Sequence, residues 1–388
     1  MNPVFANTPT TIFEEMSTLA RAHDAVNLGQ GFPDGDEPRL ILDAAADALT
    51  RHPNQYPPMR GLLELRHAVA EHDKRFHGLD IDPEREVLVT SGATEALAAC
   101  FLGLLEAGDE VIVFDPAYDS YVPMIRRAGG VARVVAMRPP SWTFDVDELR
   151  RAFTEKTKLV VVNTPMNPTG RVLTRDELTA IANLALEHRA YVVSDEVYEH
   201  IVFAPHRHVS MLGMPGMRDR AIKIGSAGKT FSVTGFKVGY ITAAPELTRV
   251  IAAAHQYLTF TTPPNLQRAV AVGLAQPDAA YAQLAAELAV KRDLFAKGLA
   301  QLGMPTTPCE GTYFLLAQVG ADDDRAYCLE LTRRARVTAI PVSALCSEHK
   351  VSGFVRFCFA KRHSLLDEAL ARLATAAMSP QPTPGSRR

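Results

Sequence analysis

Residues 226–240 read SAGKTFSVTGFKVGY, and this stretch decides which fold we expect. The apolar run Ala221–Ile224 before it predicts a strand, and the small residues that follow predict a turn carrying Lys229. The letters GKT copy the end of a nucleotide-binding P-loop, but the first glycine of that motif would fall on Lys223. The glycine-rich chain as far as Tyr240 also predicts a turn and another strand, where a P-loop needs a helix. We therefore exclude a P-loop and expect a lysine held at the end of a strand.

Two further polar residues accompany this lysine. Ser226 and Lys237 lie on either side of Lys229 in the sequence and are free to meet a phosphate. A lysine at a strand end beside a phosphate site is the arrangement that a Schiff-base lysine needs. The alternative is a surface lysine on a loop, the usual place of lysine in proteins. This stretch alone leaves both interpretations open.

Length and composition limit the class of protein. A chain of 388 residues predicts one larger and one smaller domain. A net charge of −3 gives no reason to expect nucleic acid or an anionic membrane as a partner. We find no apolar run of membrane-spanning length and no signal peptide, so we expect a cytoplasmic protein. The five cysteines contain no CxxC pair and predict reduced core thiols, not disulfides or a zinc site.

Strand and helix patterns alternate through the first two thirds of the chain. The predicted strands are Glu86–Thr90, Glu110–Phe114, Leu159–Val162, Tyr191–Ser194, Ala221–Ile224 and Lys237–Thr242. One predicted helix covers Ala93–Leu105, and a capping box at Thr174–Glu177 opens another that runs to about Arg189. Such alternation is typical of an α/β fold, with a mostly parallel sheet covered by helices on both faces.

The pattern changes after a long predicted helix that begins at Asp278 and ends at Gly303. Beyond it we predict strands and helices of a smaller α+β domain, namely strands Thr312–Ala317, Val337–Ile340 and Phe354–Ala360 and helices Asp324–Ala335 and Leu365–Met378. We therefore expect a large domain of residues 40–277 and a small domain of residues 1–39 and 278–378, which includes the long interdomain helix. The proline-containing tail, residues 379–388, is expected to be disordered.

Two loops at strand ends carry polar groups suited to a ligand, because open α/β sheets bind ligands there. Thr94 lies at the start of the helix that follows Ser91-Gly92, where free amide groups suit a phosphate. The alternative is a plain strand–helix turn with the threonine as cap. Asn167 lies in a loop that two X-Pro units make rigid, and this rigidity would fix the direction of its side-chain amide. The alternative is an ordinary turn.

Two charged residues in apolar surroundings point to ligand groups of opposite charge. Asp195 ends a predicted strand, and it is either a helix cap or a buried carboxylate that needs a cation such as a pyridinium nitrogen. Tyr198 would point to the same side. Arg356 lies between apolar neighbours on a predicted strand, so we expect it to bind an anion. That anion is either a structural Asp or Glu or a substrate carboxylate. By contrast, His200, His206 and His208 lack zinc-site spacing and predict a surface loop, so we expect no metal.

Taken together, these segments resemble the class I/II aminotransferases, which are fold type I enzymes dependent on pyridoxal 5′-phosphate. The resemblance extends from Thr11 to about Met378 and is closest to the kynurenine, glutamine and methionine aminotransferase branch, with bacterial succinyldiaminopimelate aminotransferases also similar. The finer likeness lies in Asn27–Asp34, Asn54–Tyr56 and Phe354–Phe357.

The resemblance implies pyridoxal 5′-phosphate as cofactor and assigns residues to its ring. Lys229 would hold the cofactor through a Schiff base and then carry a proton in catalysis. Asp195 would pair with the ring nitrogen and keep it protonated. Asn167 and Tyr198 would hydrogen-bond the ring oxygen, and Tyr118 would stack on the ring face. Lys229, Asp195 and Tyr198 are the expected catalytic residues.

The resemblance also assigns residues to the phosphate. It would be held by Ala93, Thr94, Ser226 and Lys237. Tyr56 would reach the phosphate of the neighbouring subunit, so a homodimer is implied.

For the substrate, the resemblance implies that Arg356 binds the α-carboxylate, helped by Gly31 and Asn167. Met166 and Phe236 replace residues frequent in this branch, histidine and tryptophan respectively. These departures leave the pocket for the substrate side chain open.

The leading hypothesis is a ping-pong aminotransferase. It would move the amino group of an L-amino acid (aromatic, methionine, glutamine or kynurenine-like) to a 2-oxo acid. A cysteine-conjugate β-lyase is an alternative, since the same carbanion would expel a β-substituent. A succinyldiaminopimelate-type aminotransferase is another alternative. It would require a second cation in the substrate pocket, and the sequence does not locate one. A pyridoxal-phosphate-sensing domain of a transcription regulator is more remote, because no DNA-binding module precedes Thr11.

Overall fold

The computed structural model describes residues 1, 3–6, 9–35 and 38–378, and the tail predicted to be disordered lies outside them. Its largest element is a seven-stranded sheet with the strand order β2-β8-β7-β6-β5-β3-β4. In that order the strands are Val87–Thr90, Gly239–Ala243, Ala221–Ser226, Tyr191–Asp195, Thr157–Asn163, Glu110–Asp115 and Val131–Ala136. All neighbours pair in parallel except β8, which is antiparallel to both β2 and β7. The predicted α/β class with a mostly parallel sheet is confirmed.

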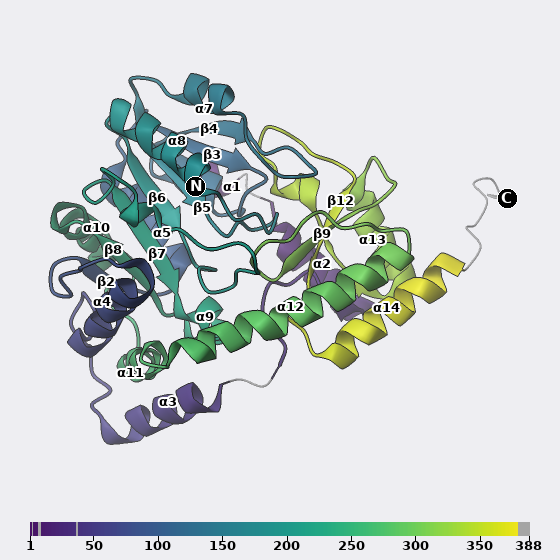
Figure 1. The fold of residues 1–388 in the computed structure, drawn as a ribbon, viewed down its shortest axis with the longest axis horizontal. Coiled ribbons are helices and arrows are strands. Elements are labelled where there is room, and N and C mark those ends of the chain that lie inside the picture. Colours follow the sequence, from purple (N-terminus) through teal and green to yellow (C-terminus); the bar gives the residue numbers. More distant parts are fainter. Residues whose placement is uncertain (2, 7–8, 36–37, 379–388) are drawn as a thin grey trace.

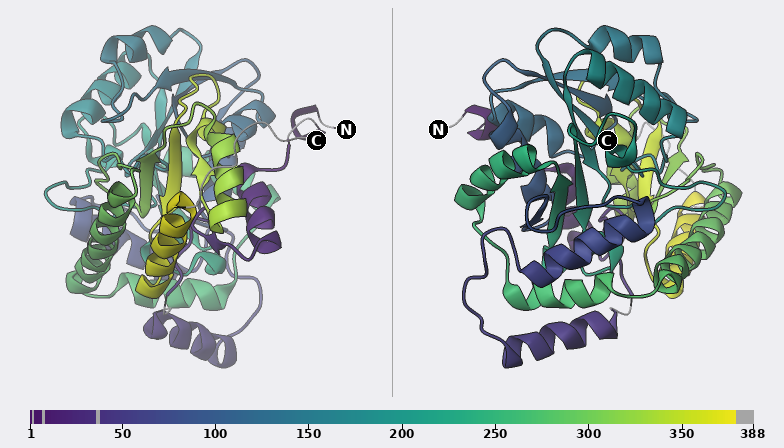
Figure 2. Two further views of the ribbon diagram at one scale, coloured as in Figure 1. Left: turned by 90° about the vertical axis from the view of Figure 1, so that its right-hand side faces the viewer. Right: turned by 60° about the vertical axis from the view of Figure 1, so that its left-hand side comes forward.

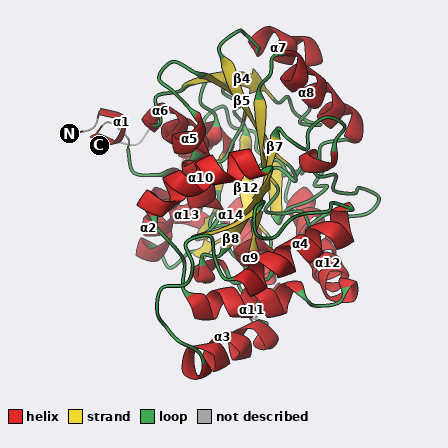
Figure 3. Cartoon of the chain, turned by 90° about the vertical axis from the view of Figure 1, so that its left-hand side faces the viewer, coloured by secondary structure: helices red, strands yellow, loops and turns green. Residues whose placement is uncertain are grey.

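Helices cover both faces of this sheet, and Figure 3 shows the strands between α5, α6 and α10 on one side and α4 and α8 on the other. Neighbouring residues of one strand enter different cores. Val111 and Val113 belong to one hydrophobic cluster and Ile112 to the other. The helices of this part are α3 (Arg39–Arg51), α4 (Leu63–His77), α5 (Ala93–Leu104), α6 (Tyr121–Arg127), α7 (Val146–Ala152), α8 (Arg175–Glu187), α10 (Pro245–Leu258) and α11 (Pro264–Leu274). The predicted capping box at the start of α8 is present, with Thr174 and Glu177 bonded reciprocally.

A second group of elements lies at the other end of the long helix α12 (Asp278–Gln301), as Figure 1 shows. Strands β11 (Ile340–Pro341), β12 (Phe354–Cys358) and β9 (Phe314–Gln318) form an antiparallel sheet in that order. The N-terminal strand β1 (Val26–Asn27) pairs in parallel with β10 (Val337–Thr338). Helices α2 (Ile12–Ala22), α13 (Asp324–Ala335) and α14 (His363–Met378) pack around these strands, which Figure 2 shows from two sides. A short helix α1 (Pro3–Ala6) precedes them. The domain boundaries themselves stay a prediction.

Two predicted strands differ from the structure in their bounds, although the turn and strand expected after β7 are present. The residues after β7 form one turn of helix, α9 (Ala227–Thr230), and a 3₁₀ turn at Thr234–Phe236, and the next strand begins only at Gly239. Chain segments pass close together here, since a Cβ on Gly228 would lie 3.0 Å from the Thr234 Cα. The strand predicted at Val337–Ile340 is divided between β10 and β11, because the chain leaves β1 there and joins β12.

In the part of the chain that the structure describes, no helix combines the length and the apolar character needed to cross a membrane. The five cysteines are all unpaired.

Candidate active site

A cavity of about 820 Å³ opens where three neighbouring strands of the large sheet end. Its lining includes the last residues of β5, β6 and β7, which are Asn163, Asp195 and Ser226. The carboxyl ends of parallel strands meet at the same edge, so loops far apart in sequence converge there. Most of the site residues predicted from the sequence line this cavity, namely Gly31, Ala93, Thr94, Tyr118, Asn167, Asp195, Tyr198, Ser226, Lys229, Lys237 and Arg356.

Lys229 lies on α9 with its amine directed into the cavity. Its Nζ donates hydrogen bonds to the Gly31 carbonyl oxygen at 3.2 Å and to the Tyr313 hydroxyl at 3.0 Å. Burial lowers the pKa of Lys229 to about 8. Near neutral pH a larger fraction of this amine is therefore neutral than in a solvated surface lysine, as a nucleophile or a base requires. Nothing in the sequence placed Tyr313 beside it; the contact comes from the packing of β9 against the N-terminal chain.

Asp195 is a buried carboxylate without a cationic partner among the described residues. Its Oδ2 accepts a hydrogen bond from the Tyr121 hydroxyl at 2.6 Å. Burial raises the pKa of Asp195 to about 6, although the Tyr121 hydrogen bond opposes this. A positively charged group in the cavity would restore the usual charged state of the carboxylate. The sequence analysis did not single out Tyr121, because its contact with Asp195 depends on how the start of α6 packs against the end of β6.

Arg356 is a buried guanidinium at the centre of β12, only 1% exposed. It donates from Nη1 to Asn167 Oδ1 and from Nη2 to the Gly29 carbonyl oxygen, both at 2.7 Å. Its Nε has no partner, and no described carboxylate forms an ion pair with it. Burial lowers the pKa of Arg356. The structural Asp or Glu considered as an alternative is therefore absent from the described residues, and the group is suited to an incoming carboxylate.

The start of α5 is suited to an anion at another side of the cavity. Gly92 is the N-cap at φ 83°, and no described side chain caps the first amides of the helix. A Cβ on Gly92 would lie 3.4 Å from the Lys237 Nζ, so a lysine amine lies beside the helix start. Helix amides and a cation together favour a phosphate. Thr94 is not a cap, because its hydroxyl bonds that of Tyr118 at 3.3 Å.

Tyr56 alone among the predicted site residues lies outside the cavity lining. Its side chain is 84% exposed and meets Phe260 edge to face, with ring centroids 5.6 Å apart. An exposed pair of aromatic rings of this kind is suited to contact with another chain.

The cavity residues fit pyridoxal 5′-phosphate. An amine with a lowered pKa suits an aldehyde, a buried carboxylate without a cation suits a protonated ring nitrogen, and the uncapped helix start beside Lys237 suits a phosphate. The orphaned Nε of Arg356 adds a place for a second anion.

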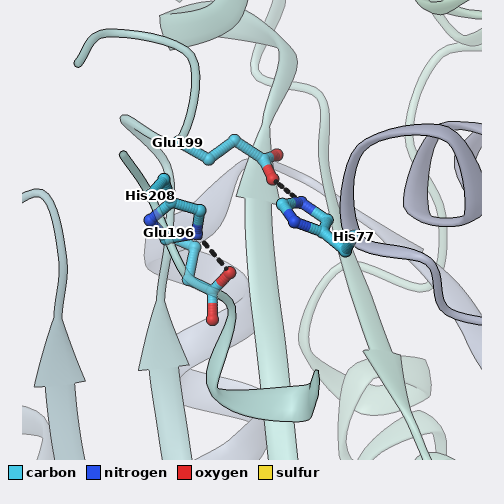
Figure 4. Close-up of side chains that lie close together, drawn as sticks. All are labelled: His77, Glu196, Glu199 and His208. Carbon is cyan, nitrogen blue, oxygen red and sulfur yellow. Dashed lines mark hydrogen bonds and ion pairs between the residues drawn. The ribbon is translucent and has the colours of Figure 1, made fainter. Parts of the chain in front are cut away.

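A separate cluster of histidine and glutamate side chains lies outside the cavity lining. Glu196 and Glu199 bond the Nε2 atoms of His208 and His77 at 2.8 Å and 2.6 Å, and Figure 4 shows both pairs. These four side chains come close enough to be considered for a metal ion. The short distances within each pair are those of hydrogen bonds with a proton between nitrogen and oxygen. We therefore interpret the cluster as a hydrogen-bonded network.

The surface-loop prediction is wrong for two of the three histidines. The His208 side chain is buried against Glu196, and the His200 Nε2 lies 2.6 Å from the His72 Nε2. Only His206 is exposed. The reason is that Glu196, directly after β6, pairs with His208, and His72 of α4 pairs with His200; a sequence gives no measure of such pairing.

Comparisons with known proteins agree with the site. The family model for aminotransferase class I and II matches residues 23–373. The chain is 45% identical to the probable N-succinyldiaminopimelate aminotransferase DapC of Mycobacterium tuberculosis, over 96% of this chain and 97% of that protein. It is 42% identical to the methionine aminotransferase of Escherichia coli, over 94% and 95%.

A solved structure gives the same result. The N-succinyldiaminopimelate aminotransferase of Mycobacterium tuberculosis superposes with a TM-score of 0.94 and covers 97% of this chain and 100% of its own. Both the sequence matches and this fold extend across the cavity and the elements that build it. The chain therefore belongs to the class I and II aminotransferases, enzymes that depend on pyridoxal 5′-phosphate.

Proposed function

We propose that this aminotransferase takes L-amino acids with large apolar side chains, such as methionine and aromatic amino acids, and passes the amino group to a 2-oxo acid. The apolar part of the cavity lining supports this choice, with Ile12, Phe13, Pro123, Met124 and Phe314. The 42% identity to a methionine aminotransferase supports it as well. The observation that carries the proposal is that Lys229, Asp195 and Arg356 line one cavity.

Lys229 is proposed as the residue that holds the cofactor and later moves the proton. When bound, pyridoxal 5′-phosphate supplies an electrophilic carbon for the amino group and a cationic ring that stabilises negative charge at the α-carbon. A lysine whose pKa is about 8 exists partly as the neutral amine near neutral pH, so it is able to take the proton from the α-carbon. Asp195, buried without a cation, would hold the proton on the ring nitrogen.

The remaining residues are proposed to position the cofactor. Asn167 and Tyr198 would donate hydrogen bonds to the ring oxygen, and Tyr118 would cover one face of the ring. The phosphate would be held by Ala93, Thr94, Ser226 and Lys237, all of which line the cavity. We propose a homodimer in which Tyr56 of each chain reaches the phosphate bound by the other, a role consistent with its exposure.

Arg356 is proposed to bind the α-carboxylate of both amino acid and oxo acid. Two parallel N–H donors match the two oxygens of a carboxylate. Gly31 and Asn167, which lie at the same end of the cavity, would assist. Because the amino acid and the oxo acid share the same carboxylate, one site would serve both half-reactions in turn, which gives ping-pong kinetics.

A donor panel tests the proposal. Holoenzyme is mixed with one L-amino acid at a time, and the cofactor absorbance is followed in a single turnover. Methionine and aromatic donors should convert the cofactor fastest, and 2-oxo acids should restore its spectrum. No conversion by any amino acid would contradict the proposal. Ammonia and pyruvate formed from a β-substituted alanine without an oxo acid would instead indicate the lyase alternative.

A further inference from the structure

The Lys229 amine is held by two acceptors that come from a different part of the chain. Its Nζ donates to the Gly31 carbonyl oxygen at 3.2 Å and to the Tyr313 hydroxyl at 3.0 Å. Gly31 follows β1, and Tyr313 lies directly before β9, in the antiparallel sheet that contains Arg356. Gly31 lines the cavity, whereas Tyr313 is buried and lies outside the cavity lining. Tyr313 therefore holds the amine without being placed to touch a substrate.

The Tyr313 hydroxyl meets the amine with its oxygen and not with its proton. It donates that proton to the Gly31 carbonyl oxygen at 2.8 Å. Burial raises the pKa of Tyr313 well above its usual value, so the hydroxyl keeps its proton at any working pH. The lone pairs of the phenol oxygen are left to accept from Lys229. The three groups thus form a closed triangle of hydrogen bonds.

The position of this hydroxyl is fixed by the packing of its ring. The Tyr313 ring meets the Tyr198 ring edge to face, with centroids 5.2 Å apart, and its centroid lies 4.8 Å from that of Phe314. The Tyr313 carbonyl oxygen accepts a hydrogen bond from the Phe359 amide at 3.0 Å, which continues the pairing of β9 with β12. Side chains in a close-packed core keep to one rotamer on the time average, so the acceptor stays in one place.

These bonds set the direction of the nitrogen lone pair. A neutral amine has two N–H groups and one lone pair, and both N–H groups of Lys229 have acceptors here. The lone pair is therefore the part of the nitrogen left to face the cavity, which Lys229 lines. The ammonium form has three N–H groups, and the described residues offer hydrogen-bond acceptors for two of them. The arrangement thus fits the neutral amine, in agreement with a pKa of about 8.

We propose that Tyr313 is a positioning residue, which directs the lone pair of the free Lys229 amine at the substrate α-carbon. The inference rests on the proposed function, because it uses Lys229 as the base. The lone pair takes the proton from the α-carbon, the amine becomes an ammonium ion, and the electron pair of the broken C–H bond stays at the α-carbon. Without the Tyr313 hydroxyl, rotation about the last C–N bond of the lysine side chain would turn the lone pair away.

The test removes the hydroxyl and keeps the aromatic ring. Tyr313→Phe is compared with the wild type and with Tyr327→Phe, a control that removes the hydroxyl of another tyrosine, on α13 and outside the cavity lining. Tyr313→Met is the second variant if Tyr313→Phe does not fold. Thermal unfolding reports folding for each protein.

Two rates are measured on each protein. The first is single-turnover conversion of the holoenzyme over a range of L-methionine concentrations, repeated with L-methionine deuterated at the α-carbon. The second is the rate at which the cofactor-free protein combines with pyridoxal 5′-phosphate, followed by absorbance. This second rate requires no turnover and reports how well the lone pair faces the cavity.

In Tyr313→Phe, the maximal single-turnover rate should fall about 10- to 100-fold, since a displacement of about 1 Å costs up to about 100-fold. The deuterium effect should be at least as large as in the wild type, because proton transfer is the impaired step. The methionine concentration that gives half the maximal rate should stay within about twofold, because Arg356 is unchanged. Combination with the cofactor should also be slower, and Tyr327→Phe should match the wild type in both rates.

A folded Tyr313→Phe or Tyr313→Met protein with unchanged rates would overturn the inference, whatever its melting temperature. A slower single turnover with a smaller deuterium effect would overturn it too, because the impaired step would then not be the proton transfer. Failure of the wild-type enzyme to convert any amino acid would instead refute the proposed function.

Discussion

Lys223 and Lys229 are six positions apart in the sequence and lie in opposite electrostatic surroundings. The Lys223 Nζ lies 2.8 Å from Asp73 and 2.9 Å from Glu199 in the buried cluster. Burial opposes its charge, but these carboxylates outweigh burial and raise the pKa of Lys223 well above its usual value. Among the described residues, the hydrogen-bond partners of the Lys229 amine are one carbonyl and one hydroxyl, and burial lowers its pKa to about 8.

The difference teaches which buried charges are structural and which are available for chemistry. In the cluster each carboxylate meets a cation or a histidine, so little remains to bind a ligand. In the cavity Asp195 and Arg356 lack counter-ions among the described residues. A group without its counter-ion is costly in a folded protein unless a ligand supplies the missing charge. We therefore expect changes in the cavity to affect turnover and changes in the cluster to affect folding.

The largest effect is expected for Lys229→Ala. General base catalysis alone contributes about 10²–10⁴-fold, and this change also removes covalent attachment, so kcat should fall by at least about 10⁴-fold. The stability of the cofactor-free protein should change little, since no ion pair is lost. Single-turnover absorbance measures the loss of turnover, and thermal unfolding measures the stability of the cofactor-free protein. Lys229→Arg keeps the charge and should be equally inactive. Substantial turnover in either variant would contradict a catalytic role of Lys229.

Lys223→Met should show the reverse behaviour. Removing one partner of a buried ion pair costs about 3–5 kcal/mol, because Asp73 and Glu199 are left without their cation. The free energy of unfolding should fall by that amount, while protein that remains folded keeps most of its activity. Denaturant unfolding measures this, with the exposed Lys156→Met as control, expected within about 0.5 kcal/mol. A stable but inactive Lys223→Met would contradict a structural role.

Arg356→Ala should lower kcat/KM of both half-reactions by about 100-fold, because a two-point charged contact is lost. It also leaves Asn167 Oδ1 and the Gly29 carbonyl without their donor, so a moderate loss of stability is expected. Arg356→Lys should restore little activity, since a single ammonium lacks the fork. A large drop in melting temperature with unchanged half-reactions would identify a purely structural arginine.

The smallest effect concerns Asp195 and pH. Its folded pKa of about 6 lies above the unfolded value near 3.9, so the folded chain binds this proton more tightly between those values. The free energy of unfolding of the cofactor-free protein should therefore fall, by no more than about 3 kcal/mol, as pH rises from about 4 to about 6. In Asp195→Asn, this contribution to the decrease in the free energy of unfolding should be absent. If the free energy of unfolding changes equally with pH in the two proteins, burial does not raise the pKa of Asp195.

The sequence predicted the parallel-rich sheet because its central strands are continuous apolar runs bounded by clear breaks. It did not reveal the edge strand β4, whose first residues alternate between exposed and half-buried and include Arg133. Lys229, Asp195 and Arg356 were predicted as site residues because each is polar at an apolar strand or its end, and all three line the cavity. Tyr313 was missed, since its contact with Lys229 depends on how the start of β9 packs against the N-terminal chain. Contacts between distant segments of this kind leave no local pattern.

The most direct test of the central claim is to find which lysine carries the cofactor. Holoenzyme is reduced with borohydride and digested with trypsin, and the labelled peptide is sequenced by mass spectrometry. We predict a single label on Lys229, within the peptide Ile224–Lys237, because trypsin does not cleave after a modified lysine. Label on Lys223 would yield the peptide Ala221–Lys229 instead. That result, or label on any other lysine, would contradict the division between a structural and a catalytic lysine.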